Sequence, residues 1–594
     1  MMRELSHNGV LIPRYDWKKL RLTVKGVEME LAPEQEEMAV AWVRKLGTNY
    51  VNDKRFVRSF LKDFCTALNL KERLGLEAFD FSIVQGHVEK EVMAKLNLPK
   101  EARKKITEQR KALRELNKER YGYAFVDGVK TEIGKYTAEP SCIFMGRGKH
   151  PLRGRWKQGP KEQDITLNLS PNVPRPAGNW KQIVWEPDVM WIARWKDKLQ
   201  GKMKHVWLSD SSLFKQQKDI EKFNKARDLQ KNLERTQTHI WENLDADDVR
   251  RRKTATVCYL IDKLKIRVGD EKDPDEADTV GAATLRPEHV RFDQDGKVIF
   301  SFLGKDSVPH VFEEVLPEAV VRNLKEFSVN TKSTLFFGVD SKRVSEFLDE
   351  VISGLSAKVF RTCYATRAVE TKLFSTPVGR EAPDHVKKHV AAMANLEAAK
   401  VCNHRRTIPK TWGSSLRRQE DRLRQLVKRS REFQEGIRDK IDRAKEMYAE
   451  RLRKEGKQLK VLEDRPQLAE KIDGGNTALL RKRIGRMQEA ITVRRERIRR
   501  LRNERAERVR KLEARLEMQR QSDRAKIEKA TLQVETKKRT RDYNLTTSLK
   551  SYIDPRVYYA WGKKVGYDWR LYYPETLQRK FSWVETDVGK SEGK

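Results

Sequence analysis

The sequence predicts an α+β protein built from several domains. Its 594 residues are enough for roughly two to four domains, yet only 38% of them are hydrophobic and 36% are charged. Part of the chain must therefore be poor in core. Composition changes abruptly beyond Pro409, into a long Arg-rich stretch with helical periodicity. We expect a mixed α/β region at 1–212, a mainly helical domain at 213–408, an antiparallel coiled coil at 409–538 and a small helical domain at 539–594.

The net charge predicts a polyanionic partner. Lys and Arg number 125 against 87 Asp and Glu, which gives +38 at pH 7, and such an excess creates an extended positive field. Nucleic acid and an anionic membrane surface both fit this field. No apolar run approaches the roughly 18 residues that a membrane span needs, and the first residues lack a signal-peptide core. We expect an intracellular protein without a membrane partner.

The cysteines predict neither disulfides nor a metal site. They are odd in number, widely scattered and never form a Cys-x-x-Cys pair. We therefore expect reduced and mostly buried thiols at all five positions, Cys65, Cys142, Cys258, Cys363 and Cys402.

The first 212 residues mix strand and helix patterns. Residues 25–31 alternate like a strand, and Ala32-Pro33-Glu34 then opens an amphipathic helix. Helical patterns continue over residues 56–70 and from Pro99 to Tyr121. Residues 183–195 predict two strands joined at Glu-Pro-Asp. Their tryptophans fit a sheet core, and a stacking platform for single-stranded nucleic acid is the alternative.

A Gly-rich basic loop, Gly-Arg-Gly-Lys-His, spans residues 146–150. Its glycines would let the backbone approach a partner closely while Arg147, Lys149 and His150 project from it. An ordinary surface turn explains the same residues.

Residues 213–408 bring four further basic or imidazole residues toward one region. A helical pattern from Lys218 to Leu264 leads to Arg267, and Gly269 and Asp270 should end that helix. Strand-like runs at 298–303 and 308–312 place Lys305 at the tip of a hairpin. A lysine at such a tip is either simply solvated or aimed at a phosphate. Further helices carry Arg361 and end near His404.

The Arg-rich stretch predicts two helical arms. Apolar residues recur every three or four positions in both arms, and helix breakers separate them at Asp464-Arg465-Pro466 and at residues 473–476. A narrow seam lets each arm bury little except against the other, so an antiparallel hairpin is the economical interpretation. The basic outer face of residues 494–500 is either solvated or in contact with phosphates. The expected seam includes Leu416, Leu423, Val427, Ile437, Ile441, Tyr448, Leu452, Ile484, Met487, Ile491, Ile498, Leu501, Leu512 and Leu516.

Beyond the arms, Tyr552 precedes Asp554-Pro555, which should leave the phenol at the end of a helix or turn. Together with the four residues above, it could form a phosphoryl-transfer site. A tyrosine that attacks a phosphodiester needs cations to hold the developing charge and an acid to protonate the leaving oxygen.

Several motifs closely resemble the eukaryotic-type, type IB DNA topoisomerase I family, and the resemblance covers nearly the whole chain. Only the arms match in character rather than in sequence. The motifs are residues 7–10, 144–151, 267–272 (Arg-Val-Gly-Asp-Glu-Lys), 277–281, 302–307 (Phe-Leu-Gly-Lys-Asp-Ser), 358–362, 402–404 (Cys-Asn-His) and 551–556 (Ser-Tyr-Ile-Asp-Pro-Arg).

The resemblance implies a bilobed clamp around double-stranded supercoiled DNA, acting as a monomer. Residues 1–212 would form the cap, 213–408 a catalytic domain related to tyrosine recombinases, 409–538 the coiled-coil linker and 539–594 the domain that carries the nucleophile. The family breaks one strand through a 3′-phosphotyrosyl bond, lets the free end rotate and reseals it. It relaxes supercoils of either sign without ATP, a metal or another cofactor.

The family's roles transfer to individual residues. Tyr552 is implied as the nucleophile, Lys305 as the general acid, and His404 as a donor to a phosphate oxygen. Two arginines are implied to bind non-bridging oxygens, Arg267 and Arg361. Four positions are implied to lie at or near DNA without catalysing the reaction: Arg147, Lys204, Thr279 and Asp306.

The chain also departs from the family pattern. Ser551 stands where the pattern has Asn, which leads to the hypothesis that camptothecin-like intercalators trap the cleaved complex weakly. Asp270 replaces another Asn, and its charge would loosen DNA binding unless Lys272 or Arg286 offsets it.

The long charged N-terminal region of eukaryotic members is missing, and the linker is longer than usual. These features suggest an archaeal or early-branching member, or a trimmed piece. The location would be nucleoid and cytoplasm in an archaeon and the nucleus in a eukaryote.

Two other functions remain as alternatives. A tyrosine site-specific recombinase shares the Arg, Lys, Arg, His and Tyr chemistry but lacks the large cap and the arm. A non-catalytic DNA-binding coiled-coil protein accounts for the arms and the charge, but not for the five residues.

Overall fold

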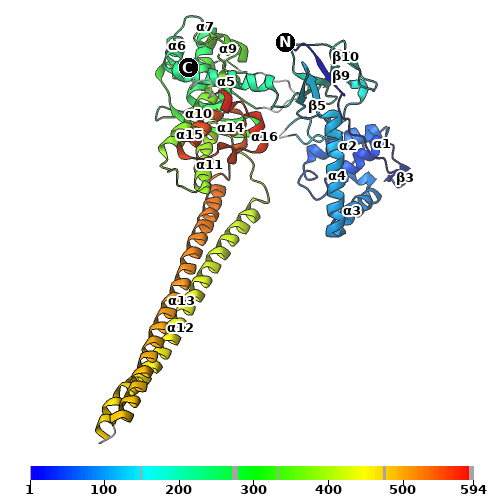
Figure 1. The fold of residues 1–594 in the computed structure, drawn as a ribbon. Helices are drawn as coiled ribbons and strands as arrows, with labels where there is room; N and C mark the ends of the chain where they lie inside the picture. The colour runs from blue at the N-terminus through cyan, green and yellow to red at the C-terminus, as the bar shows by residue number, and fades with distance from the viewer. Residues whose placement is uncertain are drawn as a thin grey trace.

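The computed structural model describes residues 2–146, 150–270, 279–329, 331, 333–472 and 477–587. Two lobes lie side by side, and a long two-helix arm extends from one of them (Figure 1). The N-terminal lobe holds residues up to about 208. The second lobe combines the chain from residue 213 to the start of the arm with the residues that follow the arm. A mixed α+β protein of several parts is thus confirmed.

The N-terminal lobe contains short sheets and two pairs of helices. Strands β9 and β10 are parallel, whereas the other pairs are antiparallel. Buried apolar residues form one core around β9 and β11 and another between α1, α2 and α3. The sheets, in spatial order, are β1 (Leu5–His7), β5 (Tyr123–Val126) and β6 (Val129–Glu132); β3 (Val27–Glu30), β2 (Arg21–Val24) and β4 (Phe79–Asp80); β7 (Cys142–Ile143) and β8 (Trp156–Lys157); and β10 (Gln182–Val184), β9 (Ile165–Asn168), β11 (Trp191–Lys196) and β12 (Met203–Trp207).

The helices of this lobe lie where the periodicity predicts them. They are α1 (Pro33–Val43), α2 (Lys54–Ala67), α3 (Ser82–Asn97) and α4 (Lys100–Tyr121), with short 3₁₀ turns at Leu76–Ala78 and Glu162–Asp164. The strands expected at residues 183–195 are also present, but β9 lies between them. Trp191 and Trp195 are buried in the sheet, and Trp185 packs against the same core. A sheet core, rather than a stacking platform, therefore explains the tryptophans.

The second lobe is mainly helical around one antiparallel sheet. Its helices are α5 (Leu213–Lys231), α6 (Leu233–Glu242), α7 (Val249–Leu264), α8 (Glu318–Ser328), α9 (Ser341–Asp349), α10 (Ala357–Ser375) and α11 (Asp384–Val401), and its sheet is β13 (Val290–Phe292), β14 (Lys297–Gly304) and β15 (Val308–Val315). Short 3₁₀ turns lie at Ala282–Thr284, Pro287–His289 and Lys305–Ser307. The continuous helical pattern expected from Lys218 to Leu264 is divided into α5, α6 and α7. The last of these ends at Leu264, not at Gly269, because Lys265 takes a left-handed conformation with φ 56°.

The residues after the arm complete a core of the second lobe. Their helices are α14 (Leu545–Ser551), α15 (Pro555–Val565) and α16 (Glu575–Lys580), with a 3₁₀ turn at Trp569–Leu571. Tyr552 and Trp561 belong to the same buried cluster as Val369 of α10 and Val390 of α11. Packing, rather than chain connectivity, therefore fixes Tyr552 against the helices that precede the arm.

Ion pairs tie this C-terminal segment to the N-terminal side. Lys550 Nζ lies 2.7 Å from Asp210 Oδ2, and Arg579 Nη1 lies 3.1 Å from Glu132 Oε2 of β6. Lys550 therefore contacts the connection between the lobes, and Arg579 contacts the N-terminal lobe itself.

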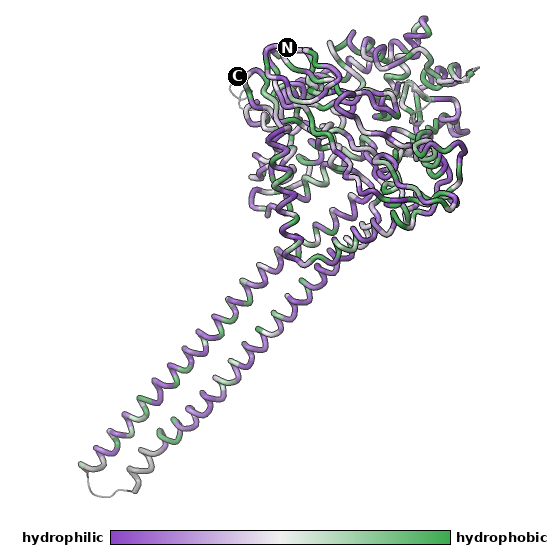
Figure 2. The backbone as a smooth tube through the Cα atoms, turned by 90° about the vertical axis from the view of Figure 1, so that its right-hand side faces the viewer, coloured by the Kyte–Doolittle hydropathy of each residue, from purple (hydrophilic) through white to green (hydrophobic). Residues whose placement is uncertain are grey.

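The arm consists of the antiparallel helices α12 (Trp412–Ile472) and α13 (Thr477–Arg539). At about 1.5 Å per residue, each is about 90 Å long. Figure 2 shows mainly hydrophilic residues along both helices, with isolated apolar positions. The apolar positions are buried mid-arm, at Ile437, Ile441 and Leu512.

Two expectations for the arm were wrong. Val427 does not face the partner helix, since 40% of it is exposed. Pro466 does not end α12, which runs on to Ile472. A proline inside a helix costs about 3 kcal/mol, and the other turns of a helix this long can offset that cost. The second expected breaker, residues 473–476, lies outside the described residues.

Chain pairing closes the base of the arm. Arg405 and Tyr543 form an antiparallel bridge, Arg406 N donates to Asp542 O at 2.9 Å, and Asn544 N donates to His404 O at 2.7 Å. The two ends of the arm therefore meet directly beside His404.

Candidate active site

Arg361 lies in the first turns of α10 and is only 2% exposed. Its Nη2 donates to the carbonyl of Cys402 and lies 3.3 Å from His404 Nε2. Its Nε and Nη1 are buried and have no hydrogen-bond partner among the described residues. Buried donors are nearly always paired, and an unpaired guanidinium is costly. The arrangement therefore fits an anion that would accept from the two free donors.

His404 is held beside Arg361 by a tight turn after α11. Asn403 is left-handed, with φ 47°, and His404 N donates to Ala399 O at 2.8 Å. The imidazole is buried, and its Nδ1 lies 2.7 Å from Ser548 Oγ. Burial, then the charges of Arg361 and Arg267, lower the pKa of His404 to about 3. The ring is therefore neutral near pH 7 and carries a single N–H.

Tyr552 closes the other side of the cluster at the end of α14, the helix-terminus position that Asp554-Pro555 predicted. Its ring centroid lies 4.9 Å from that of His404, and the Arg361 guanidinium carbon is 4.9 Å above its face. The backbone is fixed by Thr366, whose Oγ1 donates to Tyr552 O at 3.2 Å and accepts from Asp554 N at 3.1 Å. A buried phenol is thus aligned beside two basic side chains.

Arg267 reaches the cluster from the segment that follows α7. Burial lowers the pKa of Arg267, and the charge of Arg361 acts in the same direction, while a hydrogen bond to Tyr552 opposes them. Two glycines allow this approach, because a Cβ on Gly269 would lie 2.7 Å from Gly281 Cα. Gly269 also has φ +78°, which favours glycine.

Lys305 occupies the predicted tip between β14 and β15 and is exposed. In the part of the chain that the structure describes, no contact joins its ammonium to the other four residues. The link is indirect and runs through His310 on β15. His310 Nδ1 lies 3.0 Å from Asn403 Nδ2, and a Cβ on Gly304 would come within 2.6 Å of His310 Nε2. The structure therefore brings four of the five predicted residues together and puts the hairpin of the fifth beside them.

The residues expected near DNA are more dispersed. Arg147 lies outside the described residues, as does the side chain of Asp306, whose backbone is in the hairpin turn. Lys204 is on β12, 3.9 Å from Asp197. It lines a cavity of about 670 Å³ between the N-terminal lobe and the C-terminal segment. Thr279 is half-buried just before Val280, whose N donates to Leu303 O of β14.

Asp270 has a structural partner that the sequence did not indicate. Its Oδ1 accepts from Ser341 N at 2.8 Å, at the start of α9. A carboxylate is favourable at a helix N-terminus, so part of its charge is compensated there. Of the two expected offsetting cations, Lys272 lies outside the described residues and Arg286 is paired with Glu288.

Sequence reasoning missed three polar residues around the cluster: Thr366, Ser548 and His310. Each acts through a contact between residues far apart in the chain. For His310, the local signal is Gly304 in the Lys305 motif, where a Cβ would come within 2.6 Å of the imidazole.

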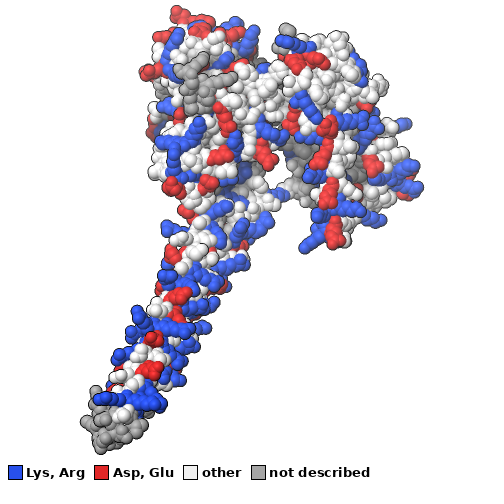
Figure 3. Space-filling model, in the orientation of Figure 1, with Lys and Arg blue, Asp and Glu red and all other residues white. Residues whose placement is uncertain are grey.

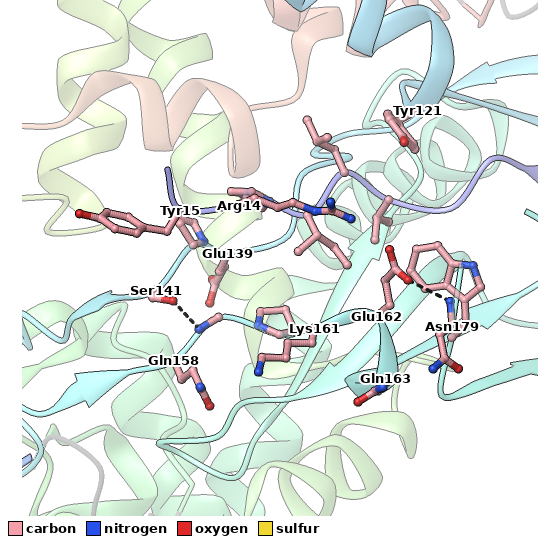
Figure 4. Close-up of a pocket in the computed structure, with 18 of the residues that line it drawn as sticks. Arg14, Tyr15, Tyr121, Glu139, Ser141, Gln158, Lys161, Glu162, Gln163 and Asn179 are labelled. Atoms are coloured by element: carbon pink, nitrogen blue, oxygen red, sulfur yellow. Dashed lines mark hydrogen bonds between the residues drawn. The ribbon is translucent and has the colours of Figure 1, made fainter. Parts of the chain in front are cut away.

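A larger cavity, of about 1150 Å³, lies within the N-terminal lobe and is separate from this cluster. Its wall includes several carboxylates and aromatic rings (Figure 4). The carboxylates bind neighbouring wall groups: Glu162 accepts from Asn179 N at 2.9 Å, and Glu34 accepts from Gln158 Nε2 at 3.1 Å. The cluster of Arg361, His404 and Tyr552, with its unpaired donors, is the stronger candidate for chemistry.

Two negative findings concern only the part of the chain that the structure describes. It contains no group of three or more His, Cys, Asp or Glu residues able to hold a metal ion. None of its helices combines the length and apolar character that crossing a membrane requires.

All five cysteines are free, and four are buried while Cys142 is exposed.

Three family models match the chain. Residues 2–208 match the eukaryotic DNA topoisomerase I DNA binding fragment, residues 211–437 match the eukaryotic DNA topoisomerase I catalytic core, and residues 524–591 match the C-terminal topoisomerase domain. The matches leave out most of the arm. This agrees with the sequence analysis, in which the arm resembles the family in composition and periodicity but not in its motifs.

Individual relatives match nearly the whole chain. DNA topoisomerase 1 alpha of Arabidopsis thaliana is 32% identical over 98% of this chain and 58% of its own length. DNA topoisomerase 1 of Candida albicans is 30% identical over 98% of this chain and 78% of its own length. The human DNA topoisomerase 1 is 29% identical over 98% of this chain and 70% of its own length. The chain spans less than two thirds of the plant relatives. On these matches, the chain belongs to the eukaryotic DNA topoisomerase I family.

Proposed function

We propose that this protein is a type IB DNA topoisomerase that relaxes positive and negative supercoils in double-stranded DNA. The observation that carries the proposal is the buried Arg361, whose two unpaired donors lie in one cluster with Tyr552, His404 and Arg267. A phosphodiester supplies the non-bridging oxygens that these donors lack. Family membership supports the same reaction.

In the proposed reaction, the Tyr552 phenol releases its proton to water and its oxygen attacks the scissile phosphorus. The bond from phosphorus to the 5′ oxygen breaks as the 3′-phosphotyrosyl bond forms, and Lys305 donates a proton to the leaving oxygen. Arg361 and Arg267 hold the charge that develops on the non-bridging oxygens, and neutral His404 donates a hydrogen bond to one of them. After strand rotation, the 5′ hydroxyl attacks the phosphotyrosine and reseals the strand.

This chemistry conserves the phosphodiester energy in the protein–DNA bond, so it needs no ATP. The positive charges of Arg267, Arg361 and Lys305 take the place of a metal ion at the phosphate. The hairpin that carries Lys305 must bring its ammonium to the leaving oxygen. Because this tip is exposed and adjoins the cluster through His310 and Asn403, bound DNA can meet it without a change in the buried core.

The parts of the chain receive corresponding roles. Residues 1–212 form a cap, and residues 213–408 form the catalytic domain related to tyrosine recombinases. Residues 409–538 form a coiled-coil linker, and residues 539–594 deliver the nucleophile. The lobes close around DNA as a clamp, with Arg147, Lys204, Thr279 and Asp306 near its path. The enzyme works as a monomer, in the nucleus of a eukaryote or the nucleoid of an archaeon.

The test is plasmid relaxation in EDTA without ATP. Wild-type protein should relax both positively and negatively supercoiled plasmid, and Tyr552→Phe should not, although it should still bind DNA. Relaxation by the Phe variant would refute the assigned nucleophile. A requirement for two defined sites would favour a recombinase, and binding without any cleavage would favour a non-catalytic protein.

A further inference from the structure

The two ring nitrogens of His404 have neighbours with different hydrogen-bonding abilities. Nε2 lies 3.3 Å from Arg361 Nη2, which can only donate. Nδ1 lies 2.7 Å from Ser548 Oγ, which can donate or accept. In this arrangement Nε2 accepts from Arg361, so the ring proton belongs on Nδ1 and is donated to Ser548.

The proposed reaction requires the other tautomer. A neutral imidazole that donates from Nε2 to a phosphate oxygen has no proton on Nδ1, which must then accept. Moving between the two forms releases one proton from Nδ1 and takes one up at Nε2, so the total is unchanged. A hydroxyl can serve both forms by rotating its hydrogen, whereas a methyl group can serve neither.

Ser548 is also built into the support of the nucleophile. It is fully buried, with 0% exposure, and its carbonyl accepts from Tyr552 N at 2.9 Å and from Ile553 N at 3.1 Å. Its hydroxyl reaches His404 across a sequence separation of 144 residues. One residue therefore bridges the segment that ends in the nucleophile and the imidazole beyond the arm.

We propose that Ser548 is a positioning residue that lets His404 change tautomer, so that Nε2–H faces the scissile phosphate when DNA is bound. This inference rests on the proposed function. Ser548 itself touches neither the nucleophilic oxygen nor the phosphate, and it acts only through the imidazole.

The first measurement is the single-turnover rate at which the protein cleaves a short DNA duplex. The duplex is designed so that the fragment with the 5′ hydroxyl dissociates after cleavage and cannot be religated. Ser548→Ala should slow cleavage about tenfold, the effect of roughly one lost hydrogen bond in the transition state, with little change in DNA affinity. The matched control is Thr546→Ala, which removes an exposed hydroxyl from the same helix and should cleave at the wild-type rate. Thermal unfolding of each variant shows whether the fold is retained.

The second measurement separates tautomer control from simple packing. His404→Gln places an amide N–H near the phosphate, and that donor does not depend on Ser548. Adding Ser548→Ala to His404→Gln should therefore slow cleavage less than twofold. A further tenfold loss in this background would overturn the proposal, because Ser548 would then act on α14 and Tyr552 rather than on His404.

The outcomes also separate this inference from the function on which it rests. If wild-type protein forms no covalent complex with DNA, the proposed function fails. If wild type and Ser548→Ala cleave equally fast, only the role of Ser548 fails.

Discussion

The Arg361 guanidinium lies over the Tyr552 ring, 4.9 Å from its centroid, while two of its own buried nitrogens have no hydrogen-bond partner among the described residues. The contact holds a cation against the ring whose oxygen is the proposed nucleophile, and it leaves donors for a phosphate. Such a site lowers the stability of the folded protein, because a buried charge is incompletely paired, but it holds the donors ready for a phosphate before DNA binds.

This relationship predicts opposite effects of Arg361→Met on activity and stability. Loss of two charge-assisted donors should reduce single-turnover cleavage by at least about 100-fold. The free energy of unfolding should not fall, because an apolar side chain of similar length replaces a buried, incompletely paired charge. Cleavage assays and urea denaturation measure the two effects. Marked destabilisation would mean that the Cys402 contact compensates the buried charge.

The depressed pKa of His404 predicts acid sensitivity. The pKa is about 3 in the folded protein and about 6.5 in an unfolded chain, so between these values the unfolded state binds more protons. Stability should therefore fall as pH decreases below about 6.5, with His404 contributing about 3 kcal/mol of the loss by pH 4. His404→Gln should flatten this dependence in urea titrations between pH 4 and 7. An unchanged slope would show that the ring is not buried neutral.

Asp270→Asn should strengthen DNA binding and weaken the fold only slightly. The asparagine oxygen can still accept from Ser341 N, while the negative charge close to Arg267 is removed. We expect a severalfold lower Kd for duplex DNA at low salt and a smaller gain at high salt, since screening reduces the effect. The comparison variant is Asp270→Ala, which also loses the contact with α9 and should be less stable than Asp270→Asn.

The basic run on α13 should divide into two groups of arginines. Arg494 and Arg497 pair with Glu455 on the opposite helix, and Arg495 pairs with Glu463. Arg499 and Arg502 are exposed, on an arm with many other basic side chains (Figure 3). If the arm contacts DNA, neutralising this second pair should reduce the slope of log affinity against log salt by up to about 2.

The control for the arm is Arg495→Gln, which removes a cross-arm pair and should leave the salt slope unchanged. Equal slopes for all three proteins would mean that the arm's arginines are solvated. Deleting about residues 415–535 should then have no effect on affinity either.

Ser551→Asn should place the amide of the family pattern beside Tyr552, the proposed nucleophile. Ser551 is half-buried at the end of α14, next to Tyr552. The serine side chain is too short to make the contacts of an asparagine, so wild-type protein should form few covalent complexes with a camptothecin-like intercalator. The variant should form more at the same dose. Strong trapping of wild type at low dose would contradict the hypothesis.

Local patterns predicted most elements, including the turn that carries Lys305 and the helix end at Tyr552. They failed where tertiary geometry decides. Apolar spacing gave no sign of the breaks between α5, α6 and α7, and the expected seam position Val427 is exposed. The expected break at Pro466 is absent because a long helix tolerates one missing hydrogen bond.

The candidate site divides in the same way. The resemblance indicated its five principal residues, because their motifs are local in sequence. Their supports were not visible, since Ser548 is 144 residues from His404 and Thr366 is 186 residues from Tyr552. Nothing in a single sequence relates such distant positions.

The pairing of Arg405 with Tyr543 means that the ends of the arm enter and leave the second lobe as neighbours. The arm is thus a side branch, and its described contacts with the lobe lie toward its base, as between His385 of α11 and Glu528 of α13. Insertions or deletions of whole helical turns in the distal parts of α12 and α13 would leave the buried cluster undisturbed. Its distal part is therefore a suitable place to attach a fluorophore or a tether for following the proposed DNA relaxation.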